Sequence, residues 1–329
     1  MKIAVFSTKP YDKEYFLKYD DKHNHELSYF ETALDQNTVG LTQGFDAICV
    51  FVNDKIQAGI IKELSKNNIK LIALRCAGYN NVDLETVRKH NIKVVRVPAY
   101  SPEAVAEHAV ALIQTLNRKT HKAYNRIREG NFSLNNLLGF NLHGKTVGVI
   151  GTGIIGSTFS KIMLGFGCRV VAFDIKKSQD LIDLGVEYLR LDDLFKVSDI
   201  ISLHCPLNPK TKHIINTVSL SKMKNGVMII NTSRGALIDT SNVIDALSSK
   251  KIGFLGIDVY EQEENFFFKD LSESIIQDDL LLRLNSFPNV LITSHQAFFT
   301  KEAMHEITST TIENFNDFEN GAELVNEVS

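Results

Sequence analysis

Short apolar runs alternate with amphipathic segments in the first part of the chain. The runs are KIAVF (2–6), FDAICVFV (45–52), IKLIALR (69–75) and IKVVRV (92–97). Segments between them, such as AGIIKELSKNN and VDLETVRKHN, place apolar residues at helical spacing. Because strands that alternate with helices build parallel sheets, this pattern predicts a first parallel α/β sheet.

After the fourth run the pattern changes to one long amphipathic stretch, which we predict to be a single helix over residues 101–130. Pro102 suits its first turn and Gly130 can end it. A second series of apolar runs follows, and a last helix is predicted from Lys301 to about Asn320. The runs of the second series are TVGVI (146–150), CRVVAFD (168–174), DIISLHC (199–205), GVMIIN (226–231), GFLGIDV (253–259) and VLITS (290–294). The chain is therefore predicted to form two open α/β sheets, with the long helix as the bridge between the two domains.

The run 146–150 leads into GTGIIG, which has the GxGxxG spacing of a dinucleotide-binding loop. In such a loop the first glycine permits a tight turn, the second lets the backbone approach a pyrophosphate, and the third lets helix pack on strand. The next strand is predicted to end at Asp174, whose carboxylate can bind the adenosine ribose hydroxyls and repel a 2′-phosphate. The cofactor is therefore expected to be NAD, although Lys176 and Lys177 leave NADP open. The loop residues expected to bind it are Gly151, Gly153, Ile154, Ile155 and Gly156.

Three polar side chains stand at or after the ends of later strands, namely Arg234, Asp258 and His295. Ligands of open α/β sheets bind beyond the carboxyl ends of the strands, where these side chains are expected to meet. A guanidinium is costly to bury unless it is paired, so Arg234, just after an apolar strand, is a candidate for binding an anionic substrate. Each of the three could alone be an ordinary structural or surface residue. Together, beside a nicotinamide, they favour a catalytic site.

Five motifs, NTSRGALID, GIDVYEQE, SHQAFFT, RCAGYNNVD and VPAYSPEAVAEHA, resemble those of the D-specific 2-hydroxyacid dehydrogenases, and within that family the fermentative D-lactate dehydrogenases. The resemblance runs from the first strand to the last helix. It implies two doubly wound parallel-sheet domains: a flavodoxin-like substrate domain of residues 1–99 and 299–329, and a Rossmann NAD domain of residues 100–298. The implied reaction is the reduction of pyruvate to D-lactate by hydride transfer from NADH.

The same resemblance assigns roles to particular residues. Arg234 would bind the substrate carboxylate, His295 would be the proton donor and acceptor, and Glu263 would hold His295. The chemistry agrees, because a planar guanidinium suits a carboxylate and an ionised glutamate favours an imidazolium; Glu261 and Glu264 are the alternatives to Glu263. Further substrate contacts would come from Ala77, Gly78, Tyr100 and Phe298, the last at a position where some relatives have tyrosine. Further cofactor contacts would come from Val105, Asp174, His204, Cys205, Pro206, Thr232, Ser233, Arg234 and Asp258.

Some of these positions have plain structural alternatives. Gly78 could be an ordinary turn glycine, and residues 204–206 could be a strand end followed by a turn. Tyr100, Phe298 and Phe299 are bulky, which favours a small oxoacid such as pyruvate over a branched one.

Composition narrows the function further. The 329 residues allow about two domains, and 44% hydrophobic residues with a net charge of −3 are typical of a globular protein that has neither nucleic acid nor a membrane as its partner. The four cysteines are scattered without zinc spacing, which predicts reduced core thiols and no metal site. The N-terminal apolar run is too short for a signal peptide, and no run reaches the roughly 18 residues of a membrane span, so a cytoplasmic location is expected.

Alternatives remain for the activity and the assembly. A relative acting on another 2-oxoacid, such as a hydroxyisocaproate or hydroxypyruvate enzyme, would share every motif. An NAD-sensing corepressor resembling the C-terminal-binding proteins would share the three polar groups, although no basic patch or disordered tail supports it. An L-specific dehydrogenase would carry its glycine loop near the N-terminus. The long helix has more apolar faces than one domain contact needs, and the resembling family pairs through its Rossmann domains, so a homodimer or homotetramer is expected.

Overall fold

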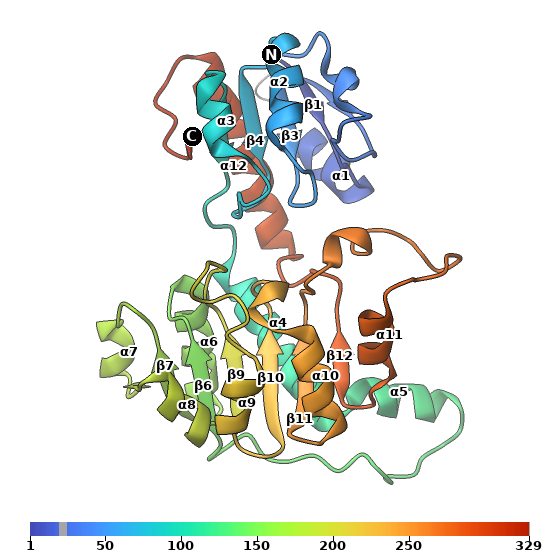
Figure 1. Ribbon diagram of the computed structural model, residues 1–329, viewed down its shortest axis with the longest axis vertical. Coiled ribbons are helices and arrows are strands. Elements are labelled where there is room, and N and C mark those ends of the chain that lie inside the picture. The colour runs from blue at the N-terminus through green and yellow to red at the C-terminus, as the bar shows by residue number, and fades with distance from the viewer. Residues whose placement is uncertain (20–24, 329) are drawn as a thin grey trace. The chain divides into compact units, whose positions relative to one another are not determined.

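The computed structural model describes residues 1–19 and 25–328. The chain forms two compact units (Figure 1). Unit 1 comprises Met1–Ser101 and Phe299–Ser329, and unit 2 comprises Pro102–Phe298. Unit 1 is thus built from both ends of the chain. Its first part ends at Ser101, whereas the sequence led us to expect the boundary after residue 99.

Unit 1 is a parallel sheet of five strands in the order β2-β1-β3-β4-β5, the flavodoxin-like order. Its strands are β1 (Lys2–Val5), β2 (Glu26–Tyr29), β3 (Ala47–Val50), β4 (Leu71–Leu74) and β5 (Lys93–Arg96). Its helices are α1 (Pro10–Tyr19), α2 (Ala58–Lys66), α3 (Leu84–Lys89) and α12 (Lys301–Glu319), with a 3-10 turn, η2 (Val39–Thr42). Alternate residues of the central strands enter separate hydrophobic clusters, with Ile48 in one and Cys49 in the other. A sheet buried on both faces needs apolar residues in succession, which explains the unbroken apolar runs.

Unit 2 is a parallel sheet of seven strands in the order β12-β11-β10-β9-β6-β7-β8. Its strands are β6 (Thr146–Ile150), β7 (Arg169–Phe173), β8 (Glu187–Tyr188), β9 (Ile200–Leu203), β10 (Val227–Asn231), β11 (Ile252–Ile257) and β12 (Val290–Ile292). Its helices are α4 (Pro102–Arg118), α5 (Thr120–Arg128), α6 (Ile154–Gly165), α7 (Gln179–Asp183), α8 (Leu191–Val197), α9 (Thr217–Lys222), α10 (Thr240–Ser248) and α11 (Asp279–Ser286), with the 3-10 turns η3 (Gly235–Leu237) and η4 (Glu263–Asn265). The strand order reverses between β6 and β9, which is the Rossmann switch point. The predicted fold class is confirmed.

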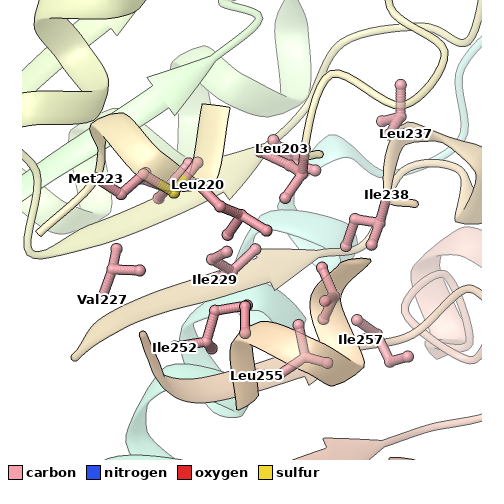
Figure 2. Packing of buried hydrophobic residues seen from close by; sticks show 14 of the residues in the cluster. Leu203, Leu220, Met223, Val227, Ile229, Leu237, Ile238, Ile252, Leu255 and Ile257 are labelled. Carbon is pink, nitrogen blue, oxygen red and sulfur yellow. The ribbon is translucent and has the colours of Figure 1, made fainter. Parts of the chain in front are cut away.

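A hydrophobic cluster supports the β9–β11 half of this sheet. Figure 2 shows side chains from β9, β10 and β11 packed with those of α9, and Leu237 and Ile238 beside them. Ile229, at the centre of β10, is fully buried there. This packing fixes the strand ends from which the candidate catalytic residues emerge.

The predicted single helix over residues 101–130 is wrong in one respect. The helix is broken into α4 and α5 at Lys119, whose φ of 52° lies in the left-handed region. Helix α4 packs against α6 and β11 inside unit 2. Two strands were not predicted: β2 lies at an edge of its sheet with three of its residues only half-buried, and β8 has two residues.

In the described ranges, no helix has the length and apolar character needed to cross a membrane. All four cysteines are buried and free.

Candidate active site

The glycine loop joins β6 to α6 at the switch point of the unit 2 sheet. Gly151 has φ 93°, and a Cβ there would lie 2.6 Å from the backbone nitrogen of Cys205. A Cβ on Gly156 would lie 2.0 Å from the Gly151 carbonyl oxygen. A Cβ on Gly153, the N-cap of α6, would meet no described atom within 4 Å. Gly151 and Gly156 are thus required by close packing. Gly153 leaves open space at the N-terminus of α6, where a pyrophosphate fits.

Asp174 follows β7 and anchors this loop. Its Oδ2 accepts hydrogen bonds from the backbone N–H of Thr152 at 2.5 Å and from the Thr152 hydroxyl at 3.2 Å. Its Oδ1 accepts from the backbone N–H of Lys176 at 3.0 Å. The Tyr188 hydroxyl donates to Thr152 Oγ1 at 2.8 Å. One carboxylate therefore couples the glycine loop to the end of the neighbouring strand.

Other predicted cofactor contacts lie at the ends of β9 and β10. His204 packs on Phe159, with ring centroids 4.8 Å apart, and burial lowers the pKa of His204 to about 3, so its ring is neutral. Burial raises the pKa of the Cys205 thiol to about 11. The Thr232 hydroxyl is buried and makes no hydrogen bond to the described chain. Such a buried polar atom without a partner, directly after β10, fits a bound cofactor. Pro206 is exposed, whereas Val105 is a buried residue of α4.

Arg234 stands between β10 and the short turn η3. Its Nη1 donates to the Ser233 carbonyl at 2.7 Å, and its own carbonyl accepts from the Asn231 side chain at 2.9 Å. A Cβ on the next residue, Gly235, would lie 2.1 Å from the carbonyl carbon of Tyr260. The glycine is therefore needed because the turn carrying Arg234 packs directly against the chain that leaves β11.

His295 and Glu263 are in direct contact at this edge of the sheet. Nδ1 of His295 lies 2.7 Å from Oε1 of Glu263, and each side chain is 16% exposed. The other carboxylate oxygen, Oε2, accepts from the backbone N–H of Tyr260 at 2.9 Å. Glu263 is thereby fixed at both oxygens. Because Nδ1 is taken by Glu263, Nε2 is the ring nitrogen that remains for a substrate.

Asp258 holds the loop that carries His295. It is fully buried after β11, and its backbone carbonyl accepts from the His295 N–H at 2.7 Å. Its carboxylate accepts from the backbone N–H groups of Gln296 at 3.0 Å and Ala297 at 2.8 Å, and from the Thr293 hydroxyl. Burial alone would raise the pKa of Asp258, but hydrogen bonds from His108, Thr293 and Ala297 hold it below its ordinary value. Asp258 thus binds the backbone of His295 and of the two residues after it, and its carboxylate remains ionised.

The neighbouring glutamate Glu261 has different partners. Its Oε1 lies 2.7 Å from Nε2 of His213, and its Oε2 accepts from the backbone N–H and the hydroxyl of Thr240. The contact with His295 is made by Glu263, as the resemblance implied.

The remaining predicted substrate contacts divide between the units. Ala77, Gly78 and Tyr100 belong to unit 1, whereas Phe298 is a buried residue of unit 2, so these contacts stay predictions. Within unit 1, the Ala77 carbonyl accepts from Nη1 of Arg96 at 2.8 Å. The Arg96 guanidinium also lies over the Tyr79 ring, 5.2 Å from its centroid. This arginine therefore braces the turn that holds Ala77 and Gly78.

Sequence reasoning missed several residues that support the site. Arg96 has no distinctive spacing. His108 lies within the quoted AVAEHA segment but gained no role there; its Nε2 lies 3.0 Å from Thr293 Oγ1 and 3.4 Å from Asp258. Phe268, whose ring lies against His295, follows two other phenylalanines and carried no signal.

A Rossmann sheet with an open glycine loop at its switch point, and a histidine–carboxylate pair beyond neighbouring strands, defines the class of nucleotide-dependent oxidoreductases. Comparison with known proteins specifies the family. Residues 110–297 match the family described as D-isomer specific 2-hydroxyacid dehydrogenase, NAD binding domain. The chain belongs to the D-isomer specific 2-hydroxyacid dehydrogenases, and its cofactor is NAD, as the sequence predicted.

Individual relatives cover the chain almost completely. It is 52% identical to the D-lactate dehydrogenase of Escherichia coli over 328 residues, with both chains fully covered. Among solved structures, the pyruvate reductase of Chlamydomonas reinhardtii has a TM-score of 0.94 at 46% identity, covering 99% of this chain and 98% of that one. The D-lactate dehydrogenase of Aquifex aeolicus complexed with NAD and lactic acid has a TM-score of 0.88 at 34% identity, with the same coverage.

Over the described residues, no three His, Cys, Asp or Glu side chains gather so that they could hold a metal ion.

Proposed function

We propose that this NAD-dependent 2-hydroxyacid dehydrogenase interconverts pyruvate and D-lactate. The observation that carries the proposal is the contact between Glu263 and His295. These residues follow β11 and β12, and Arg234 follows the adjacent strand β10. Similarity over the full length to proteins named D-lactate dehydrogenase and pyruvate reductase supports this substrate.

The reaction requires the protein to bind an anion and to deliver a proton. The guanidinium of Arg234 would hold the substrate carboxylate through two parallel hydrogen bonds, which a lysine cannot make. Nicotinamide, when bound, supplies the hydride for the carbonyl carbon. His295 would protonate the carbonyl oxygen from Nε2 and take the proton back in the reverse reaction. Glu263 would stabilise the imidazolium through Nδ1.

A steady-state assay tests this function directly. We expect NADH oxidation with pyruvate, a product that is D-lactate and not L-lactate, and NAD reduction with D-lactate alone. His295→Ala should lower turnover by about 100- to 10,000-fold, the usual contribution of a positioned acid or base, while NADH still binds. A higher kcat/KM for 2-oxoisocaproate or hydroxypyruvate than for pyruvate would assign the enzyme to another oxoacid. Absence of turnover with every oxoacid would overturn the proposal.

We also infer that the protein is a homo-oligomer assembled through unit 2. Helix α5 and the segment after it expose large apolar side chains, including Ile127 at 56%, Leu134 at 82% and Leu138 at 89%. Exposed apolar residues grouped in this way mark protein interfaces. Light scattering should give at least twice the mass of one chain, and Leu134→Asp with Leu138→Asp should lower it; a monomeric wild-type mass would refute this inference.

We further propose a cytoplasmic location. The four free cysteines support it, because thiols stay reduced in that compartment.

A further inference from the structure

The chain between β11 and α11 forms a long loop whose two ends are tied together. The Tyr260 hydroxyl lies 2.9 Å from both carboxylate oxygens of Asp278. Asp278 also caps α11 by accepting from the backbone N–H of Leu281 at 2.8 Å. Residues 261–278, which we call the β11–α11 loop, are thus closed at their base. The two ends of this loop are therefore fixed to one another and to the start of α11.

One turn of this loop presents two side chains to His295. The backbone carbonyl of Glu263 accepts from the N–H groups of Phe266 and Phe267, which closes the turn η4. The Glu263 carboxylate binds Nδ1 of His295. The ring of Phe268, directly after the turn, lies against the imidazole, with centroids 5.8 Å apart and planes at 39°.

Both members of the ring contact have unusual backbone conformations. Phe268 has φ 62° and His295 has φ 54°, in the left-handed region that is uncommon for residues other than glycine. Such conformations persist where the surrounding contacts determine them, and they concentrate at functional sites. For His295 the surrounding contacts are those of Asp258. Phe268 directly follows the turn that the Glu263 carbonyl closes with the N–H groups of Phe266 and Phe267.

We infer that Phe268 is a positioning residue for His295. A single hydrogen bond at Nδ1 leaves the imidazole able to swing about the bond, so the direction of Nε2 is not fixed by Glu263 alone. An aromatic ring against the imidazole removes that freedom and keeps water from one side of the ion pair. The inference rests on the proposed role of His295 as proton donor.

Substitutions of Phe268 in the full-length enzyme test this role. Phe268→Ala should lower kcat for pyruvate reduction by about 10- to 100-fold, since small displacements of a catalytic group have effects of that order. The Kd for NADH should stay within twofold. Phe268→Tyr keeps the ring and should restore most of kcat. Phe266→Ala is the matched control, because Phe266 belongs to the same turn and packs against the same hydrophobic cluster; its kcat should stay within about threefold of wild type.

A spectroscopic measurement separates this inference from the proposed function. In the protein without cofactor or substrate, the carbon-bound imidazole protons of His295 should show a ring-current shift, assigned by its loss in His295→Gln. The shift should disappear in Phe268→Ala and persist in Phe268→Tyr and Phe266→Ala. Equal kcat in Phe268→Ala and Phe266→Ala, or an unchanged His295 signal in Phe268→Ala, would overturn the inference. An inactive wild-type enzyme that shows the expected signals would instead refute the proposed function alone.

Discussion

Replacement of Asp258 by asparagine should show how much the hydrogen bonds that Asp258 accepts from the loop of His295 contribute to stability. Asparagine has nearly the same shape but replaces one acceptor oxygen by an NH2 donor. The fully buried carboxylate of Asp258 accepts from Gln296 and Thr293 at one oxygen and from Ala297 at the other. Either orientation of the amide therefore leaves a buried donor facing another donor.

The expected loss follows from these contacts. A hydrogen bond to a charged group contributes about 1.5–3 kcal/mol, and a buried donor left unpaired costs a further 1–3 kcal/mol or so. We therefore expect Asp258→Asn to lower the free energy of unfolding of unit 2 by roughly 3–5 kcal/mol. Thr293→Val removes the hydroxyl that donates to Asp258 and contacts Nε2 of His108, and should cost about 1.5–3 kcal/mol.

Urea unfolding followed by circular dichroism measures this loss, since the chain has no tryptophan to report by fluorescence. The pH dependence supplies a second check. The pKa of folded Asp258 is depressed, so its contribution is complete above its unfolded pKa of about 3.9 and is lost as the pH falls through the folded value. The difference between wild type and Asp258→Asn should therefore be constant near neutral pH and shrink in acid. A difference under about 0.5 kcal/mol at pH 7 would show that the hydrogen bonds to Asp258 are not a source of stability.

Three further changes test the chemistry at the sheet edge. Arg234→Lys keeps the charge but loses the planar fork, and should lower kcat/KM for pyruvate by roughly 10- to 100-fold, or about 1.5–3 kcal/mol; a near-wild-type value would contradict the carboxylate role. Asp174→Ala should narrow the preference for NADH over NADPH and lower kcat/KM for NADH as well, because Thr152 loses its acceptor; equal use of both cofactors by the unaltered enzyme would count against this assignment. Glu263→Gln removes the charge beside Nδ1 of His295 and should lower kcat for pyruvate reduction, because a protonated imidazole loses its anionic partner; an unchanged kcat would show that this charge does not contribute to the reaction.

Features encoded in short stretches of sequence were predicted well. Runs such as residues 146–150 are apolar throughout because both faces of the sheet are covered, and this pattern is visible without a structure. The glycine spacing at Gly151 and Gly156 reflects backbone contacts that any side chain would block. By contrast, β2 and β8 lie at the edges of their sheets, where few apolar residues are needed.

The break between α4 and α5 had no such signal. Lys119 takes a left-handed conformation that glycine or asparagine usually signals, and its side chain donates to the carbonyl of Asn136 at 2.7 Å. Helix propensity alone favours continuation through a lysine. The contact that accompanies the break comes from residues well along the chain, so it could not be inferred from the local pattern.

The choice among the glutamates after β11 shows the same limit at the site itself. Glu261, Glu263 and Glu264 are equivalent by composition, and only the family motif favoured Glu263. In the structure, Glu261 binds His213 and Thr240, whereas Glu263 contacts His295. The assignment therefore depends on contacts between loops that follow different strands.

The environment of His295 is built almost entirely from contacts of this kind. Asp258 fixes its backbone, Glu263 fixes one ring nitrogen, and Phe268 lies against the ring. Glycine at a left-handed position announces itself in a sequence, as at Gly151, but a histidine or a phenylalanine does not. The left-handed backbone at His295 and at Phe268 accompanies contacts between two loops, so the local sequence does not indicate it. The backbone, one ring nitrogen and one side of the ring of His295 are therefore all contacted from residues 258–268, so the imidazole cannot turn without breaking contacts to that stretch of chain.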